Sequence, residues 1–109
     1  MSITAADLST MSTWIVEAVH PEKIKLFGSH ARGDETSDSD VDLLVIVSKN
    51  FNGSERWQMM QSIRKAIARI RCSKDILVYS REEVERWHTS INHVVANALR
   101  EGKVLYEGS

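Results

Sequence analysis

Two aspartates separated by one residue stand at the start of a strongly apolar segment. They are Asp40 and Asp42, and the apolar residues 43–47 follow directly. Alternate residues of a β-strand project from the same face, so both carboxylates point the same way. Two neighbouring carboxylates repel each other by about 3 kcal/mol, and a divalent cation with hard oxygen ligands is the usual reason to hold them together. The sequence therefore predicts a metal site at Asp40 and Asp42.

A Gly-Ser pair, Gly28-Ser29, precedes Asp40 by ten intervening residues. Glycine lets a bound group approach the backbone closely, and serine adds a hydroxyl and a free N–H, which suits a phosphate. A short helical turn is expected to begin at Ser29. The plain alternative is a strand-to-helix turn with serine as its N-cap. Arg32 follows about one turn later, where it can reach a phosphate or pair with a carboxylate.

The spacing Gly28-Ser29-x10-Asp40-x-Asp42, with the surrounding residues 26–34 and 37–45, resembles the minimal nucleotidyltransferases of the polymerase-β-like superfamily. The resemblance implies an enzyme that transfers an NMP unit, expected to be AMP from ATP, to a hydroxyl group. It also implies two Mg²⁺ ions held by Asp40 and Asp42. Asp75 is the expected third carboxylate, as a metal ligand or a base, and Gly28 and Ser29 are expected to hold the phosphates.

The same resemblance implies a biological partner. Small relatives pair with an all-helical HEPN protein, an RNase toxin, and act as antitoxins that adenylylate a tyrosine of the toxin. Two alternatives stay open. One is a non-catalytic module that neutralises its partner by contact alone, and the other is a small enzyme that acts on a small molecule or an RNA end.

Other interpretations of the same residues can be compared directly. Asp38-x-Asp40-x-Asp42 begins like an EF-hand loop, but Leu43 and Lys49 occupy the positions that require glycine and glutamate. The EF-hand interpretation therefore fails. Asp75 could instead cap a turn at the start of a strand, and His30 is expected to face solvent or a partner.

Composition predicts one soluble domain over residues 1–109. The net charge is −1, which gives no overall attraction to nucleic acid, so direct DNA binding is not expected. The single Cys72 excludes an internal disulfide, fits a reducing compartment, and is expected to be a buried small residue. The longest apolar run, residues 43–47, is too short to span a membrane, and the N-terminus lacks a basic region followed by an apolar core. These features predict a cytoplasmic protein.

Periodicity predicts an α/β fold, a small mixed β-sheet flanked by helices. Helices are expected up to residue 19 after a Thr4-x-x-Asp7 capping box, over 55–71, up to 87 after a Ser80-x-x-Glu83 box, and over 90–100. Strands are expected over 23–27, 41–47 and 75–79, with residues 103–106 as a short strand or an extended tail.

The long helix is expected to combine an apolar stripe with a basic surface. The stripe consists of Trp57, Met60, Ile63, Ile67 and Ile70. The basic residues are Arg56, Arg64, Lys65, Arg69 and Arg71, which form either a solvated face or a docking surface for an acidic partner. All three tryptophans, Trp14, Trp57 and Trp87, are expected mainly in the core, although Trp87 stands at a helix junction and could be exposed.

Overall fold

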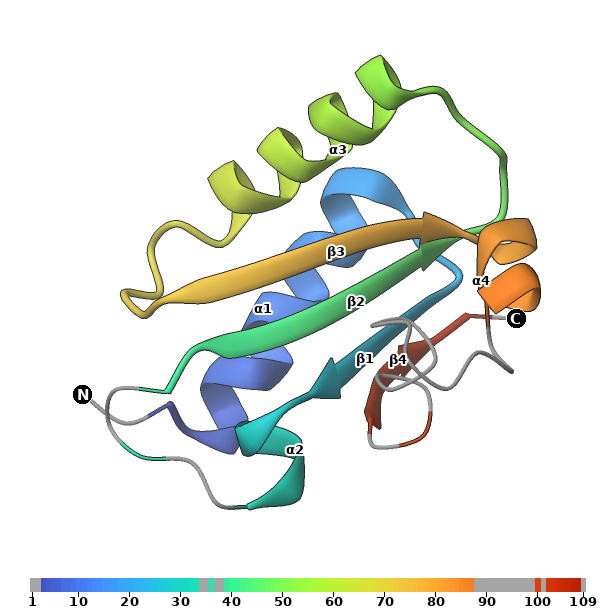
Figure 1. The fold of residues 1–109 in the computed structure, drawn as a ribbon. Coiled ribbons are helices and arrows are strands. Elements are labelled where there is room, and N and C mark those ends of the chain that lie inside the picture. Colours follow the sequence, from blue (N-terminus) through green and yellow to red (C-terminus); the bar gives the residue numbers. More distant parts are fainter. Residues whose placement is uncertain (1–2, 34–35, 37–38, 88–99, 101, 109) are drawn as a thin grey trace.

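A four-stranded sheet in the order β3-β2-β1-β4 forms the centre of the molecule (Figure 1). The computed structural model describes residues 3–33, 36, 39–87, 100 and 102–108. The elements are α1 (Ala5–Val19), β1 (Lys23–Phe27), α2 (Ser29–Arg32), β2 (Val41–Val47), α3 (Gly53–Ala66), β3 (Lys74–Ser80), α4 (Arg81–Trp87) and β4 (Lys103–Glu107). The expected helix over 90–100 lies outside the described residues, apart from residue 100.

The sheet is mixed, as predicted. β1 pairs antiparallel with both β2 and β4, and β2 pairs in parallel with β3. The parallel pair needs a crossover connection, and α3 supplies it. The C-terminal residues form the edge strand β4, which settles the choice between a strand and an extended tail.

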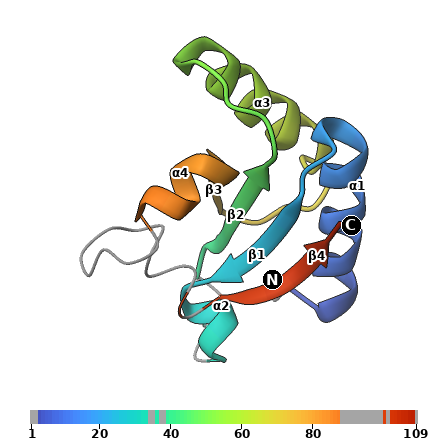
Figure 2. The same cartoon turned by 90° about the vertical axis from the view of Figure 1, so that its right-hand side faces the viewer.

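The two faces of the sheet are covered differently. α1 and α3 lie on one face, and α4 lies at the end of the other, as the two ribbon views show (Figures 1 and 2). Val41, Leu43 and Val45 of β2 point toward α1 and α3 and are fully buried there. Asp42 and Leu44 alternate with them and belong to the opposite face. The predicted carboxylate site therefore lies on the sheet face turned away from α1 and α3.

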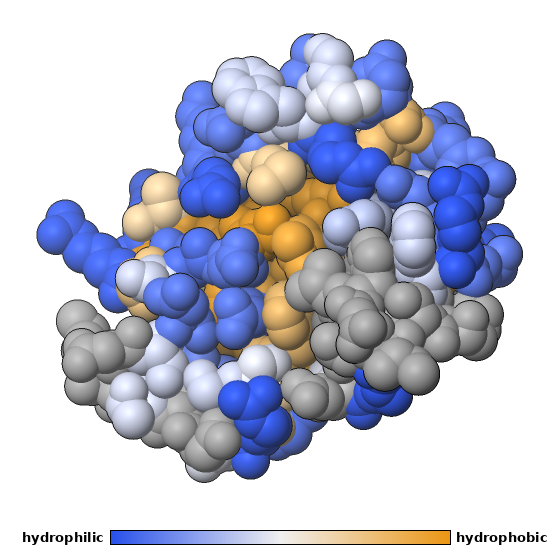
Figure 3. Space-filling model, in the orientation of Figure 1, coloured by the Kyte–Doolittle hydropathy of each residue, from blue (hydrophilic) through white to orange (hydrophobic). Residues whose placement is uncertain are grey.

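That second face combines apolar and polar surface. Its buried centre consists of Leu44 and Ile46, with Phe27, Leu77, Tyr79 and Val84 packed around them. Hydrophobic atoms are visible over the middle of this face between blue, hydrophilic surroundings (Figure 3). Within the described residues, no helix combines the length and apolar character needed to cross a membrane.

Local signals in the sequence explain where the helices begin. In α1 the Thr4 hydroxyl accepts from the Asp7 N–H at 3.1 Å, and the Asp7 carboxylate accepts from the Thr4 N–H at 3.0 Å. The box predicted at the start of α4 is present too, because Ser80 and Glu83 exchange the same two bonds, at 3.1 and 3.0 Å. Each box satisfies N–H groups that a helix start leaves unpaired.

The helix α3 differs from the expected range at both ends. It begins at Gly53 rather than at residue 55, because Asn52 and Glu55 form a third capping box. It ends at Ala66 rather than at residue 71. Beyond that point the bonds tighten to three-residue turns, from the Ala68 N–H to the Lys65 carbonyl and from the Ile70 N–H to the Ile67 carbonyl. The chain thereby still packs Ile67 and Ile70 onto the core.

The placement of Trp57 in the core was wrong, since its side chain is 63% exposed. Ile63 is fully buried and sets the inward direction of α3. Two turns before Ile63 the inward position is Arg56, whereas Trp57 points about 120° away. Trp14 does pack against the core, and Trp87 is 37% exposed at the end of α4.

Candidate active site

The sheet register brings two of the predicted carboxylates side by side. Asp42 is in β2, the strand between β1 and β3, where its partner on β1 is Phe27 and its partner on β3 is Asp75. Neighbouring strands are about 4.8 Å apart, so Asp42 and Asp75 project as neighbours from the same face. Asp40 immediately precedes β2 and is exposed, as is Asp75, while Asp42 is half-buried. The three predicted acidic residues thus gather at one end of one sheet face.

The electrostatics of Asp42 reflect this crowding. Burial raises the pKa of the Asp42 carboxyl above its ordinary value, and the charges of Asp75 and Asp40 raise it further. His30 and Arg32 act in the opposite direction and lower it. A bound cation would relieve the repulsion among the carboxylates, so the arrangement favours a positively charged ligand.

Gly28 lies directly against the Asp42 carboxylate. A β-carbon at position 28 would lie 2.2 Å from Oδ2 of Asp42, far inside van der Waals contact. Gly28 also has φ +74°, a backbone conformation that other residues rarely adopt. Only glycine fits at this junction, where the chain leaves β1 and enters α2.

The short helix α2 follows and carries the rest of the motif. The Gly28 carbonyl accepts from the N–H groups of Ala31 and Arg32, both at 3.1 Å, and the Ser29 carbonyl accepts from Gly33 at 3.0 Å. These bonds confirm the helical turn predicted at Ser29. They turn the chain so that Arg32 lies close enough to influence the Asp42 carboxyl.

His30 has a position that the sequence did not indicate. It is half-buried, and its Nε2 lies 3.4 Å from the Ser39 carbonyl oxygen, in the residue before Asp40. The Val41 N–H donates to the Ser73 carbonyl at 2.8 Å on the other side of Asp40. These two contacts position the chain around Asp40. The sequence could not predict the His30 contact, because this contact joins a helix to a loop and has no characteristic residue spacing.

The donor set suits a phosphate-bound magnesium ion. Among the residues that the structure describes, no three His, Cys, Asp or Glu side chains form a ready-made metal site. Mg²⁺ usually keeps several waters and is held by one or two carboxylates together with substrate phosphates. Asp40 and Asp42, with their hard oxygen atoms and unfavourable mutual charge, fit that mode of binding.

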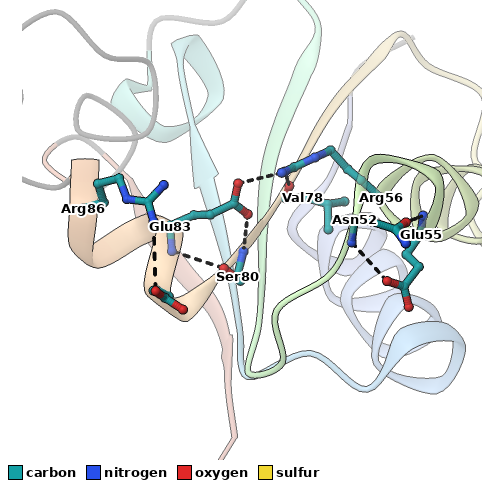
Figure 4. A network of polar contacts seen from close by, with 8 residues as sticks. Asn52, Glu55, Arg56, Val78, Ser80, Glu83 and Arg86 are labelled. Atoms are coloured by element: carbon teal, nitrogen blue, oxygen red, sulfur yellow. Dashed lines mark hydrogen bonds and ion pairs between the residues drawn. The ribbon is translucent and has the colours of Figure 1, made fainter.

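Arg56 was predicted on a solvated or docking surface, but it forms an internal clamp (Figure 4). Its Nη1 donates to the Val78 carbonyl, and its Nη2 lies 2.6 Å from Oε2 of Glu83. Its guanidinium stacks 4.6 Å from the Phe51 ring centroid and 5.0 Å from that of Tyr79. The clamp joins α3, β3 and α4. The sequence did indicate the inward direction of Arg56, because Arg56 lies two helical turns before the buried Ile63.

Cys72 is half-buried beside the core rather than fully buried. Burial raises the pKa of its thiol, which keeps the sulfur protonated at neutral pH. A protonated thiol is a poor nucleophile, in line with the expectation that Cys72 has no chemical role.

Comparison with known proteins identifies this arrangement. A family model described as polymerase beta, nucleotidyltransferase matches residues 12–109. The protein MJ0604 of Methanocaldococcus jannaschii, whose name provisionally describes a protein adenylyltransferase, is 34% identical over 86 residues, which are 78% of each chain.

Solved structures show the same fold. A Sulfolobus solfataricus protein provisionally described as a nucleotidyltransferase aligns with a TM-score of 0.60 at 22% identity, covering 98% of this chain and 92% of that one. A Shewanella oneidensis complex of an MNT antitoxin with a tri-AMPylated HEPN toxin aligns with a TM-score of 0.55 at 16% identity, covering 94% and 71%.

The mixed sheet, with acidic residues at one end and a Gly-Ser turn against them, defines a nucleotidyltransferase domain. The chain belongs to the polymerase-β nucleotidyltransferase family.

Proposed function

We propose that this protein transfers AMP from ATP, with Mg²⁺, to a tyrosine hydroxyl of a partner HEPN RNase toxin and so acts as its antitoxin in the cytoplasm. The observation that carries the proposal is the contact between the Gly28 backbone and the Asp42 carboxylate, beside Asp75. This contact brings the Gly-Ser turn and a group of carboxylate oxygens together, which supports a shared site for phosphate and metal.

Each residue of the site has a separate role in this proposal. Asp40 and Asp42 bind the metal, and Gly28 and Ser29 hold the β- and γ-phosphates through backbone N–H groups and the Ser29 hydroxyl. Arg32 adds positive charge to the triphosphate. Mg²⁺, expected as two ions, supplies neutralisation of phosphate charge and lowers the pKa of the attacking hydroxyl.

The proposed transfer is a single displacement at the α-phosphorus of ATP. The acceptor oxygen forms a bond to the α-phosphorus of ATP, and the bond from that phosphorus to the oxygen bridging to the β-phosphate breaks. Pyrophosphate leaves with both electrons of that bond. The hydroxyl proton passes to the Asp75 carboxylate, which is exposed and adjacent to Asp42.

Two relatives support a protein as the acceptor. The M. jannaschii relative carries a protein adenylyltransferase name, and the Shewanella neighbour holds a toxin that is AMPylated. A HEPN protein encoded beside this chain is therefore the acceptor to test.

The experiment is label transfer from α-labelled ATP to that purified HEPN protein, with Mg²⁺ and then with EDTA. Label should appear on the partner only with Mg²⁺, and unlabelled ATP should compete better than the other three NTPs. Absence of label with all four α-labelled NTPs would reject the transferase proposal.

Neutralisation by contact alone is a second candidate, because the Shewanella neighbour is an antitoxin held in a complex with its toxin. Asp40→Asn combined with Asp42→Asn separates the two. If the double variant binds the toxin but no longer protects cells from it, protection needs chemistry. If protection survives, contact is enough.

A further inference from the structure

Charge is unevenly distributed along this nearly neutral chain. Residues 56–74 contain six lysines and arginines and no aspartate or glutamate. The rest of the chain contains the remaining eight basic residues against all fifteen acidic ones. The basic segment runs from α3, which carries Arg56, Arg64 and Lys65, through the following turn to Lys74 at the start of β3, on an otherwise acidic molecule.

Two of these six cations lie on an exposed helix face that also carries a tryptophan. We define the outer α3 face as Trp57, Gln61, Arg64 and Lys65, all of which are exposed. Trp57 and Arg64 are two turns apart and point in nearly the same direction, about 10 Å from one another along the axis. No ion pair to Arg64 or Lys65 is found among the described residues. The face therefore combines a large apolar side chain with two exposed cations.

The location of this face connects it with the acidic site. α3 runs alongside β3 at the edge of the sheet, and α1 lies on its other flank (Figures 1 and 2). β3 is the terminal strand of the sheet, and it presents Asp75. α3 runs antiparallel to β3, so its end with Arg64 and Lys65 lies toward the start of β3, where Asp75 is, while Trp57 lies toward the other end of that strand (Figure 1). A molecule that covers this face and crosses the edge of β3 at its first residues meets Asp75.

We propose that the outer α3 face is a docking surface for an acidic region of the acceptor protein, with the Trp57 indole inserted into an apolar pocket of that protein. The proposal rests on the proposed function, since it assigns how the acceptor is recruited. Tryptophan and arginine are the residues that most often dominate binding energy at protein interfaces. The positive charge selects an acidic partner and speeds its approach.

A nucleic acid would also be attracted to positive charge, but the rest of the molecule argues against it. The remaining chain is strongly acidic, and its acidic residues include those of the site beside β3. A long phosphate backbone crossing this edge would meet that negative charge, whereas a folded protein can present acidic groups to α3 alone. A second copy of this chain would also offer acidic surface, and the experiment distinguishes it.

The test measures binding of the HEPN protein encoded beside this chain, by calorimetry at two salt concentrations. Trp57→Ala is expected to weaken binding by about tenfold or more, as for an interface anchor. Lys65→Glu is expected to weaken it several-fold and to reduce its salt dependence. Lys103→Glu is the matched control, because Lys103 is an exposed lysine on β4 at the opposite edge of the sheet; it should bind like wild type.

Kinetics separate docking from chemistry. Trp57→Ala and Lys65→Glu should raise KM for the acceptor protein and leave kcat and the affinity for ATP unchanged. Asp42→Asn should show the opposite pattern, with intact binding and no transfer. If wild type binds without transferring AMP, the proposed function fails while the binding data still judge the docking surface.

Three results would overturn the docking proposal. One is wild-type affinity in both Trp57→Ala and Lys65→Glu. The second is dimerisation of the chain alone, seen by light scattering and abolished by Trp57→Ala, which would assign the face to a second copy. The third is tight binding of a single-stranded RNA oligonucleotide that Lys65→Glu abolishes while toxin binding persists.

Discussion

The Asp42 carboxylate occupies the space where any residue other than glycine at position 28 would place its β-carbon. The distance from that ideal β-carbon to Oδ2 is 2.2 Å and to Cγ is 3.2 Å. Two motifs separated in sequence thus meet in one contact. The direction of the Asp42 side chain and the path of the turn after β1 depend on each other.

Gly28→Ala tests this dependence. The added methyl group must displace the Asp42 carboxylate, and the backbone must also leave its positive φ. We expect AMP transfer to fall at least 100-fold, since small displacements of reacting groups cost that much, and stability to fall by about 1–3 kcal/mol.

Gly33→Ala provides the control, read in label transfer and urea unfolding. Gly33 also has positive φ, but no atom of the described residues lies within 4 Å of its ideal β-carbon. It should lose stability while keeping most of its activity. Equal losses of activity in the two variants would contradict a specific role for the Gly28–Asp42 contact.

Magnesium should stabilise the folded protein through the carboxylates. Neutralising the repulsion among Asp40, Asp42 and Asp75 favours the folded state, and any ligand that binds only that state raises its stability. We expect the Tm of wild type to rise with millimolar MgCl₂ in the presence of a non-hydrolysable ATP analogue. Asp40→Asn with Asp42→Asn should show no such rise by scanning calorimetry, and an equal rise would place the metal elsewhere.

Asp42 should make the protein less stable as pH rises. Folding raises the pKa of its carboxyl above the ordinary value of 3.8, so the folded state binds the proton more tightly than the unfolded chain. Stability therefore falls as pH rises through the window between 3.8 and the raised value, and stays lower above it.

The substitution Asp42→Asn should remove this loss of folding stability at high pH, because asparagine does not ionise. Without metal, the variant should be more stable than wild type at pH 7 by roughly 0.5–1 kcal/mol, the size of a cross-strand pair interaction. Urea unfolding at a series of pH values measures the difference, which should shrink as pH approaches 3.8. A variant less stable than wild type at pH 7 would contradict the electrostatic account.

The sequence predicted those parts of the fold that local patterns encode. The apolar run of β2 and the Ser80–Glu83 box lie where expected, because a continuous apolar run and a capping box are both encoded by residues close together in the sequence. The predicted end of α3 at residue 71 was wrong. After Ala66 the chain changes to three-residue turns, and with these turns Ile70 packs against the core. The position of Trp57 was wrong because apolar character was given more weight than helical phase.

Only part of the candidate site could be predicted from the sequence, because some of its contacts depend on how the strands pair. The motif spacing identified Asp40 and Asp42, but the contact of Asp42 with Gly28 and its pairing with Asp75 follow from the sheet register. The Arg56 clamp joins α3, β3 and α4, which are far apart in the sequence. Its contacts therefore could not be predicted from the sequence alone. His30 belongs to the same class, because its contact reaches the Ser39 carbonyl.

The Arg56 clamp should contribute measurably to stability. Burial works to raise the pKa of Glu83, but hydrogen bonds from the Ser80 N–H and from Arg56 hold it below its ordinary value. Arg56→Met should lower stability by about 1–2 kcal/mol, because the ion pair is half-exposed and the Val78 carbonyl loses its donor.

A double-mutant cycle of Arg56→Met with Glu83→Gln isolates the pair itself. Urea unfolding should give a coupling of about 1 kcal/mol near pH 7. The coupling should fade as acid protonates Glu83 below its lowered pKa. Additive effects of the two substitutions at pH 7 would show that the ion pair contributes nothing.

The most direct test of the central claim is the intact mass of the HEPN partner after incubation with this protein, ATP and Mg²⁺. The account predicts that the partner gains one or more AMP units, located on tyrosine by fragmentation, and that Asp42→Asn abolishes the gain while the complex still forms. A partner of unchanged mass in a stable wild-type complex would contradict it, as would an AMP gain that Asp42→Asn leaves intact.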